Sequence, residues 1–190
     1  MKCSIVDIHT HRPTGKALEP SFAGIHPWQA ETRRIEEIVP RFGEVDLVGE
    51  IGLDYAGTVG REAQLRIFRE QLDWAERLGK PVVLHCVKAF EAVMRELAPH
   101  ALRAVIFHGF IGSSQQAAEA IKKGYYLSFG ERTFRSPRTV EALRRTPVEN
   151  LFAETDESEE IYRRIAQAKD LDPELLKCAI YRNYREIFER

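Results

Sequence analysis

Three polar residues at a spacing of two follow a short apolar run near the start of the sequence. In SIVDIHTHRPTG, residues 4–15, the polar positions are Asp7, His9 and His11. Successive side chains of a strand point to opposite faces, so a strand here would direct all three toward the same side. One carboxylate and two imidazoles on one face are suited to a divalent metal ion. A lone His-x-His pair is also common in strands that bind nothing.

Other histidines and acids stand where further apolar runs end: His26 in AGIHPW, Glu50 in LVGEIGLDY, His85 in PVVLHC, His108 in AVIFHG and Asp156 in LFAETDES. The carboxyl ends of parallel strands share one edge of a sheet or barrel, so these side chains are predicted to meet. Four histidines and two acids at such positions are more ligands than one tetrahedral metal site can hold, which favours two divalent ions bridged by a carboxylate. Imidazole and carboxylate ligands by themselves do not determine whether the metal is Mg, Mn or Zn.

The elements that would position these groups alternate along the chain. Short apolar runs predict about seven strands, at residues 4–8, 22–25, 46–51, 81–84, 104–107, 125–128 and 150–153. Helical spacing predicts helices at residues 32–39, 61–79, 89–97, 114–123, 137–145 and from 157 onward. Strand followed by helix, repeated, is typical of βα units with a parallel sheet. The sequence therefore predicts an α/β fold.

Length narrows this prediction to a shortened barrel. A (β/α)8 barrel needs about 200 residues or more, and this chain has 190. Only about ten residues separate His11 from Phe22, too few for a helix and an additional strand. We expect one TIM-barrel-like domain over residues 1–190, incomplete or distorted on that side.

The amino-acid composition excludes few functional classes of protein. Lys plus Arg is 28 against 29 for Asp plus Glu, so net charge does not predict a nucleic-acid partner, although a local basic patch would be compatible. Three cysteines without a CxxC pair favour a reducing compartment over a disulfide framework. No apolar run approaches the length of a membrane span, and no secretory signal pattern is present. These features predict a cytoplasmic protein without a membrane segment, and no obligate protein partner is evident.

The motifs together resemble the TatD-related family of metal-dependent hydrolases, the TatD-type deoxyribonucleases. DIHTH is similar to the family's DxHxH start, GIHPW to its GIHP segment, and VGEIGLDY to its most distinctive string. Later matches are QLDWAERLGKPVVLHC, HGFIGSSQQAAEAIKKGYYLSFG, LFAETD and RNYREIF. They run in order across nearly the whole chain.

The resemblance implies a role for each matched position. His9 and His11 would bind the first metal ion, His85 and His108 the second, and Glu50 would bridge both. Asp156 would complete the first site and orient or deprotonate the attacking water, which makes Asp156 and Glu50 the implied catalytic residues. The implied activity is hydrolysis of phosphodiester bonds in DNA with two divalent ions per chain.

Several segments depart from the family pattern and leave the substrate open. The family's HCR segment is HCVKA here, so Lys88 would replace an arginine at a phosphate as a point charge. Ser113 could contribute to a phosphate site at a helix start, although Ser113 and Gln116 also form a complete capping box. His26 could face a scissile phosphate or pack under Trp28.

A basic cluster and two further functions complete the alternatives. Arg132, Arg135 and Arg138 would track a nucleic-acid backbone or simply be solvated. Besides a deoxyribonuclease, the sequence is compatible with a metal-dependent hydrolase of another ester, phosphoester or amide. It is also compatible with a metal-binding relative that lacks nuclease activity.

Overall fold

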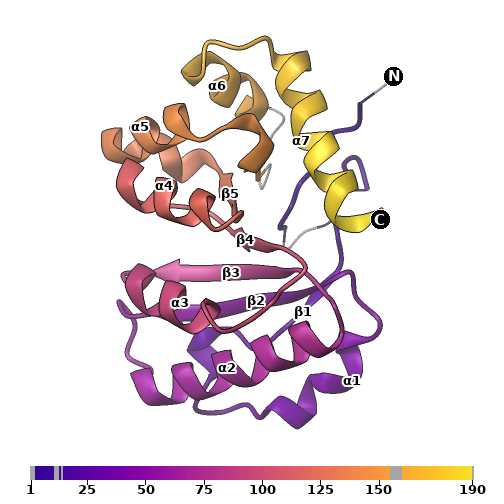
Figure 1. Cartoon of the computed structure of the whole chain (residues 1–190), viewed down its shortest axis with the longest axis vertical. Coiled ribbons are helices and arrows are strands. Elements are labelled where there is room, and N and C mark those ends of the chain that lie inside the picture. Colours follow the sequence, from indigo (N-terminus) through magenta and orange to yellow (C-terminus); the bar gives the residue numbers. More distant parts are fainter. Residues whose placement is uncertain (1–2, 11–12, 14, 155–159, 190) are drawn as a thin grey trace. The chain divides into compact units, whose positions relative to one another are not determined.

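The computed structural model describes residues 3–10, 13, 15–154 and 160–189, and the chain divides into two compact units. One unit is Ser21–Phe107, and the other combines Met1–Pro20 with His108–Arg190. We call them the middle unit and the terminal unit. Figure 1 labels most of the helices and strands of both units.

The middle unit contains four parallel strands in sequence order. They are β1 (Phe22–Ala23), β2 (Leu47–Asp54), β3 (Val82–Val87) and β4 (Val105–Phe107). The helical elements are the short 3-10 turns η1 (Pro27–Gln29) and η2 (Ile35–Glu37) and the helices α1 (Val39–Phe42), α2 (Arg61–Arg77) and α3 (Phe90–Leu97). Every residue of β2 is buried, as expected for a central strand of a parallel sheet.

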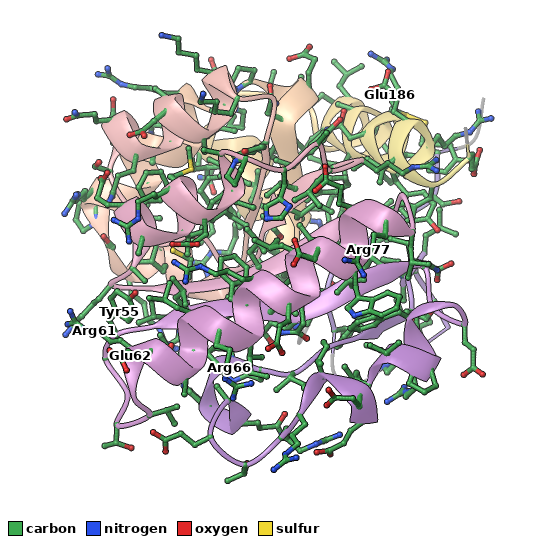
Figure 2. The ribbon with its side chains drawn as sticks, turned by 60° about the horizontal axis from the view of Figure 1, so that its bottom comes forward. Tyr55, Arg61, Glu62, Arg66, Arg77 and Glu186 are labelled. Carbon is green, nitrogen blue, oxygen red and sulfur yellow. A yellow bond between two sulfur atoms is a disulfide. The ribbon has the colours of Figure 1, made fainter. Side chains whose placement is uncertain are left out.

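Helix α2 packs against β2 through one apolar face (Figure 1). Ile67, Phe68 and Leu72 are buried on that face, while the labelled charged residues of α2 in Figure 2 lie on its exposed side. Buried Gln71 binds the backbone of Ile25, accepting from its N–H at 2.6 Å and donating to its carbonyl at 3.1 Å. The helix thereby holds the loop that follows β1.

The terminal unit contains two parallel strands, β5 (Tyr126–Phe129) and β6 (Leu151–Ala153). Its helices are α4 (Ser114–Lys122), α5 (Pro137–Arg145), α6 (Glu160–Ala168) and α7 (Pro173–Phe188), with the 3-10 turns η3 (Glu131–Arg135) and η4 (Val148–Asn150). The N-terminal segment joins this unit through Tyr162, whose hydroxyl donates to the carbonyl of Val6 at 2.7 Å and accepts from its N–H at 3.0 Å.

The parallel α/β prediction is confirmed, but the strand count is six in the described part of the chain. Residues 4–8 form no strand: Val6 makes an isolated parallel bridge with Leu18. The stretch 32–39 is not one helix, because residues 35–37 form the 3-10 turn η2 and a separate short helix begins at Val39, with Pro40 in its first turn. The predicted C-terminal helix is likewise divided, since Asp172 caps the start of α7 and Pro173 occupies its first turn.

The prediction that no disulfide forms is wrong. Cys3 and Cys178 are bonded, which links the N-terminal segment to α7 across 175 residues of sequence. No sequence spacing signals such a pair, because it depends on tertiary proximity alone. Cys86 is left outside the bond, and burial raises the pKa of its thiol to about 12. The cytoplasmic prediction, which rested partly on unpaired cysteines, loses that support.

The described helices include none that is both long and apolar enough to cross a membrane.

An ion pair between α2 and α3 predicts a pH-dependent stability. Arg69 donates to Glu96 through Nε at 2.6 Å and a terminal nitrogen at 3.0 Å, and the hydrogen bond from Arg69 holds the pKa of the Glu96 carboxyl below its usual range. The stabilisation is therefore present above the unfolded-state pKa and is lost as pH falls through the folded-state pKa. We expect Glu96→Gln to lower the free energy of unfolding at neutral pH by about 1 kcal/mol, since solvent screens the largely exposed Arg69.

Urea unfolding at neutral pH and at about pH 3 measures this effect. The difference between wild type and variant should shrink at the acidic pH. The matched control is Glu91→Gln, because Glu91 lies exposed on the same helix. An equal loss of stability at both pH values would contradict the ionic role of Glu96.

Candidate metal centre

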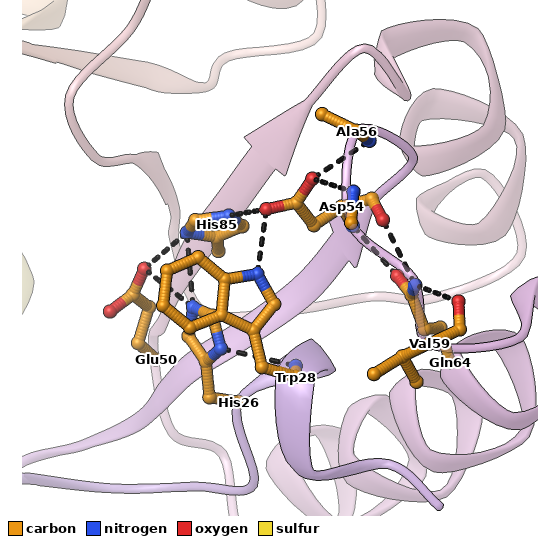
Figure 3. Close-up of polar contacts among 9 residues, drawn as sticks. His26, Trp28, Glu50, Asp54, Ala56, Val59, Gln64 and His85 are labelled. Atoms are coloured by element: carbon orange, nitrogen blue, oxygen red, sulfur yellow. Dashed lines mark hydrogen bonds and ion pairs between the residues drawn. The ribbon is translucent and has the colours of Figure 1, made fainter.

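His85, near the carboxyl end of β3, lies between two carboxylates of the neighbouring strand β2 (Figure 3). Its Nδ1 is 2.6 Å from Oε1 of Glu50, and its Nε2 is 3.0 Å from Oδ2 of Asp54. Parallel pairing sets Gly52 opposite His85, so the acids two residues before and two residues after Gly52 flank the imidazole. The three side chains are at most 12% exposed.

Two glycines allow this close approach of β2 to β3. A Cβ added to Gly52 would overlap the carbonyl oxygen of His85, and Gly52 has a φ of 140°, which side-chain-bearing residues rarely adopt. A Cβ on Gly49 would overlap the side chain of Val83. The GEIG string therefore positions Glu50 against His85 because glycine stands on both sides of the acid.

Both ring nitrogens of His85 face carboxylates, so the contact with His26 decides between the two tautomers of the neutral ring. Nδ1 of His26 accepts the backbone N–H of Trp28, which leaves the proton of neutral His26 on Nε2, 3.2 Å from His85 Nδ1. Nδ1 of His85 is then an acceptor and its own proton lies on Nε2 toward Asp54, so Nδ1 and Glu50 Oε1 are two acceptors 2.6 Å apart. Such a pair is repulsive unless a proton or a metal cation lies between the atoms. This arrangement fits a divalent cation, with Asp54 orienting the ligand imidazole from behind.

His26 joins the same cluster from the N-terminal cap of η1. Its Nε2 is 3.2 Å from His85 Nδ1 and 3.5 Å from Glu50 Oε1, and all three residues have a ligand atom within 4.8 Å of the others. Nδ1 of His26 accepts the backbone N–H of Trp28 at 3.2 Å, which places the proton of the neutral ring on Nε2. His26 in this tautomer is a hydrogen-bond donor toward the cluster.

Asp54 is held in its ionised form by several donors. Oδ2 accepts from Trp28 Nε1 at 2.8 Å as well as from His85, and Oδ1 accepts from the backbone N–H groups of Ala56 and Gly57. Burial alone would raise the pKa of Asp54, but the hydrogen bonds from Trp28, His85 and Ala56 outweigh it and leave the pKa lowered. Asp54 can therefore keep accepting from His85 at neutral pH.

The terminal unit contains a second group of histidines with an acid. The rings of His9 and His108 have centroids 4.4 Å apart, and His108 Nδ1 is 3.2 Å from Oε1 of Glu154. The same oxygen accepts the backbone N–H of Gly109 at 2.6 Å. Burial would raise the pKa of Glu154, but the charges of His108 and His9 and its hydrogen bonds lower it overall. Two imidazoles beside an ionised carboxylate are also a plausible ligand set by chemistry.

The predicted ligands divide between the two units. Glu50 and His85 lie together in the middle unit, and His9 and His108 lie together in the terminal unit. His11 and Asp156 lie outside the described residues. The assignment of six ligands to two ions stays a prediction.

The secondary candidates have simpler surroundings. Lys88 is exposed directly after β3, with a φ of 51°. Ser113 is the N-cap of α4 and accepts the backbone N–H of Gln116 at 3.2 Å, which confirms the capping box. Arg132 and Arg135 are exposed on η3, and Arg138 reaches Gln116 at 3.4 Å. The phosphate contacts proposed for these residues stay predictions.

Sequence reasoning missed Asp54, Glu154 and the part played by Trp28. Asp54 lies beyond the end of the predicted strand at residues 46–51, whereas the observed β2 extends to it, and its even spacing from Glu50 was the available signal. Glu154 directly follows the predicted strand at residues 150–153, and that position at the end of an apolar run was the available signal. Nothing in the sequence indicated the hydrogen bond between Trp28 and Asp54.

Comparison with known proteins agrees with this picture. YjjV from Escherichia coli K12, described as an uncharacterized metal-dependent hydrolase, is 33% identical in a 151-position alignment that covers 73% of this chain and 58% of the relative. The 3'-5' ssDNA/RNA exonuclease TatD of Citrobacter rodentium is 29% identical in a 202-position alignment that covers 88% of this chain and 76% of that protein.

Solved structures show the same fold. The crystal structure of Escherichia coli YjjV, a TatD homologue, aligns with a TM-score of 0.81 at 24% identity, covering 90% of this chain and 77% of that one. A TatD family hydrolase from Entamoeba histolytica aligns with a TM-score of 0.79 at 17% identity, covering 91% and 75%. The predicted TIM-barrel-like α/β fold is thus confirmed, with six strands in the described residues where about seven were expected.

The family model described as "TatD related DNase" matches residues 16–189. The chain nevertheless spans only 50% to 58% of the length of the first three curated relatives. Because the match covers nearly the whole sequence, the chain belongs to the TatD-related DNase family.

Proposed function

We propose that this chain is a divalent-metal-dependent hydrolase that cleaves phosphodiester bonds in DNA. The observation that carries the proposal is the buried group of Glu50, His85 and His26, in which Nδ1 of His85 lies 2.6 Å from a Glu50 carboxylate oxygen while Asp54 contacts the far side of the imidazole. Buried acceptors in such an arrangement are stabilised by a cation. Membership of the family and the second histidine group, His9 with His108, support the same chemistry.

The proposed centre holds two divalent ions, Mg, Mn or Zn. Its proposed ligands are the six residues predicted from the sequence: His9, His11, Glu50, His85, His108 and Asp156. Metal ions bound there would lower the pKa of a water molecule and stabilise charge on the phosphate oxygens. No property of the described residues selects one metal over another.

Individual residues of the chain have separate proposed roles in metal binding, proton transfer and phosphate binding. Glu50 supplies negative charge to the cation site, and Asp54 keeps the lone pair of His85 Nδ1 directed at it. Asp156 is proposed to accept the proton of the attacking water. His26, with its Nε2 proton toward the cluster, is suited to donate a hydrogen bond to a phosphate oxygen. Lys88 and Ser113 are proposed as weaker phosphate contacts.

A nucleic-acid substrate is the best-supported choice. The Citrobacter relative is named as an exonuclease of single-stranded DNA and RNA, and the family is described by its DNase activity. A second candidate, hydrolysis of a different ester, phosphoester or amide, is favoured by one observation. The family's HCR segment is HCVKA here, so a phosphate at this position would meet the point charge of Lys88 in place of a bidentate arginine.

One experiment separates these functions. The purified chain, with its metal content measured by elemental analysis, is incubated with labelled single- and double-stranded DNA and with ester and amide substrates, in Mg, Mn or Zn and in EDTA. We expect about two ions per chain and metal-dependent cleavage of DNA, abolished by EDTA. Cleavage of esters or amides without DNA cleavage would favour the second candidate. A metal-free protein without turnover would refute the proposed centre.

A further inference from the structure

Trp28 is the only aromatic residue among the exposed large hydrophobic residues in the described part of the chain, with 63% of its surface accessible. Large aromatic side chains are usually buried, so an indole left in solvent beside a polar cluster requires an explanation. Its neighbours on that side are His26, His85 and Asp54, which are all polar (Figure 3). Burial in a core does not explain its position.

The exposed ring is nevertheless held in place. Its Nε1–H donates to Oδ2 of Asp54 at 2.8 Å, the same oxygen that receives His85 Nε2. The ring packs edge to face against His26 with centroids 4.6 Å apart, and the backbone N–H of Trp28 donates a hydrogen bond to His26 Nδ1. Pro27 restricts the preceding backbone in the first turn of η1. Trp28 therefore presents a largely fixed aromatic surface to solvent.

That surface stands next to the proposed reaction centre. The centroid of the indole is 6.0 Å from that of His85, whose Nδ1 faces Glu50. One carboxylate oxygen of Asp54 sets the position of both rings. A planar group attached to a phosphate at this centre would lie within reach of the indole.

Resting on the proposed function, we infer that Trp28 is a stacking platform for the nucleobase next to the phosphate that is cleaved. Every nucleobase has a π face, so stacking on a fixed tryptophan binds single-stranded nucleic acid without selecting a sequence. The unpaired base of a single strand is accessible to such a platform, whereas a base within a duplex is already stacked on its neighbours. The site should therefore favour single-stranded substrates.

The test measures binding separately from cleavage. The metal-loaded full chain is titrated with a hydrolysis-resistant phosphorothioate oligothymidylate and with an abasic phosphorothioate of the same length, both followed by anisotropy and by tryptophan fluorescence. Three variants are compared with wild type. Trp28→Gln keeps an amide donor for Asp54 but lacks the ring, Trp28→Phe keeps a ring but lacks the N–H, and Trp74→Phe removes the chain's other tryptophan.

For each protein, the ratio of its affinities for oligothymidylate and for the abasic oligomer measures what the bases contribute to binding. We expect this ratio to be about 5- to 150-fold larger for wild type than for Trp28→Gln, which is the coupling expected of one stacked base. Trp28→Phe should retain most of that coupling. Oligothymidylate should quench the fluorescence of Trp74→Phe, where Trp28 is the remaining tryptophan, and should leave that of Trp28→Phe unchanged. Equal coupling in wild type and Trp28→Gln, or absence of quenching in Trp74→Phe, would overturn the inference.

Failure of this inference is distinguishable from failure of the proposed function. Metal-dependent DNA cleavage without quenching or coupling would refute stacking on Trp28 and leave the nuclease proposal standing. Quenching and coupling without cleavage would support the platform and refute the nuclease activity.

Discussion

Glu50→Gln is expected to lower metal-dependent turnover at least about 100-fold and to reduce the number of ions bound per chain. Changing a residue that merely orients a metal ligand typically costs 10- to 100-fold, so loss of the carboxylate that is proposed to bridge two ions should reach or exceed the upper end. The physical reason is that glutamine keeps the shape of Glu50 but removes the negative charge that faces His85 Nδ1 at 2.6 Å. Turnover on DNA and metal content by elemental analysis measure the two effects.

Glu62→Gln is the matched control for this prediction. Glu62 is also on the middle unit, but it lies exposed in the first turn of α2 (Figure 2). Its variant should bind metal and turn over substrate as wild type does. Normal metal content and turnover in Glu50→Gln, with unchanged unfolding, would remove Glu50 from the proposed centre.

Loss of the disulfide is expected to cost the terminal unit about 3–5 kcal/mol of unfolding free energy. The bond closes a loop with a sequence separation of 175 residues, so it removes much conformational freedom from the unfolded chain. Guanidinium unfolding of the wild-type chain, with and without dithiothreitol, measures the difference, and Cys3→Ser should match the reduced wild type.

The Cys3→Ser variant also controls for effects of dithiothreitol other than reduction of the disulfide. Dithiothreitol should leave the stability of Cys3→Ser unchanged, because Cys86 and Cys178 then have no disulfide between them to reduce. Equal stability of oxidised wild type and Cys3→Ser would show that the covalent link contributes nothing. It would also show that the contacts of Tyr162 with Val6 suffice to hold the N-terminal segment.

Much of the architecture could be predicted because local patterns encode it. The helix at residues 61–79 was recognisable from its apolar spacing, and Gly79, which has a φ of 61°, ends it as a C-terminal glycine should. Ser113 and Gln116 form the capping box that their spacing predicts. The first predicted strand failed because residues 4–8 make a single bridge, and β-bridges depend on a partner elsewhere in the chain.

The sequence by itself determined the family and the parallel α/β class, because apolar runs and motif spacing are local properties. It also marked the histidines and acids that are proposed as metal ligands, although Glu50 and His85 lie within β2 and β3 and not at their ends. Only the tertiary structure decided which groups meet. The pairing of Cys3 with Cys178, the placement of Asp54 behind His85, and the fixing of an exposed Trp28 by that same carboxylate all join residues that are distant in sequence. The contact of Asp54 with His85 depends on strand register and on the close approach that Gly49 and Gly52 allow, and both arise when β2 packs against β3.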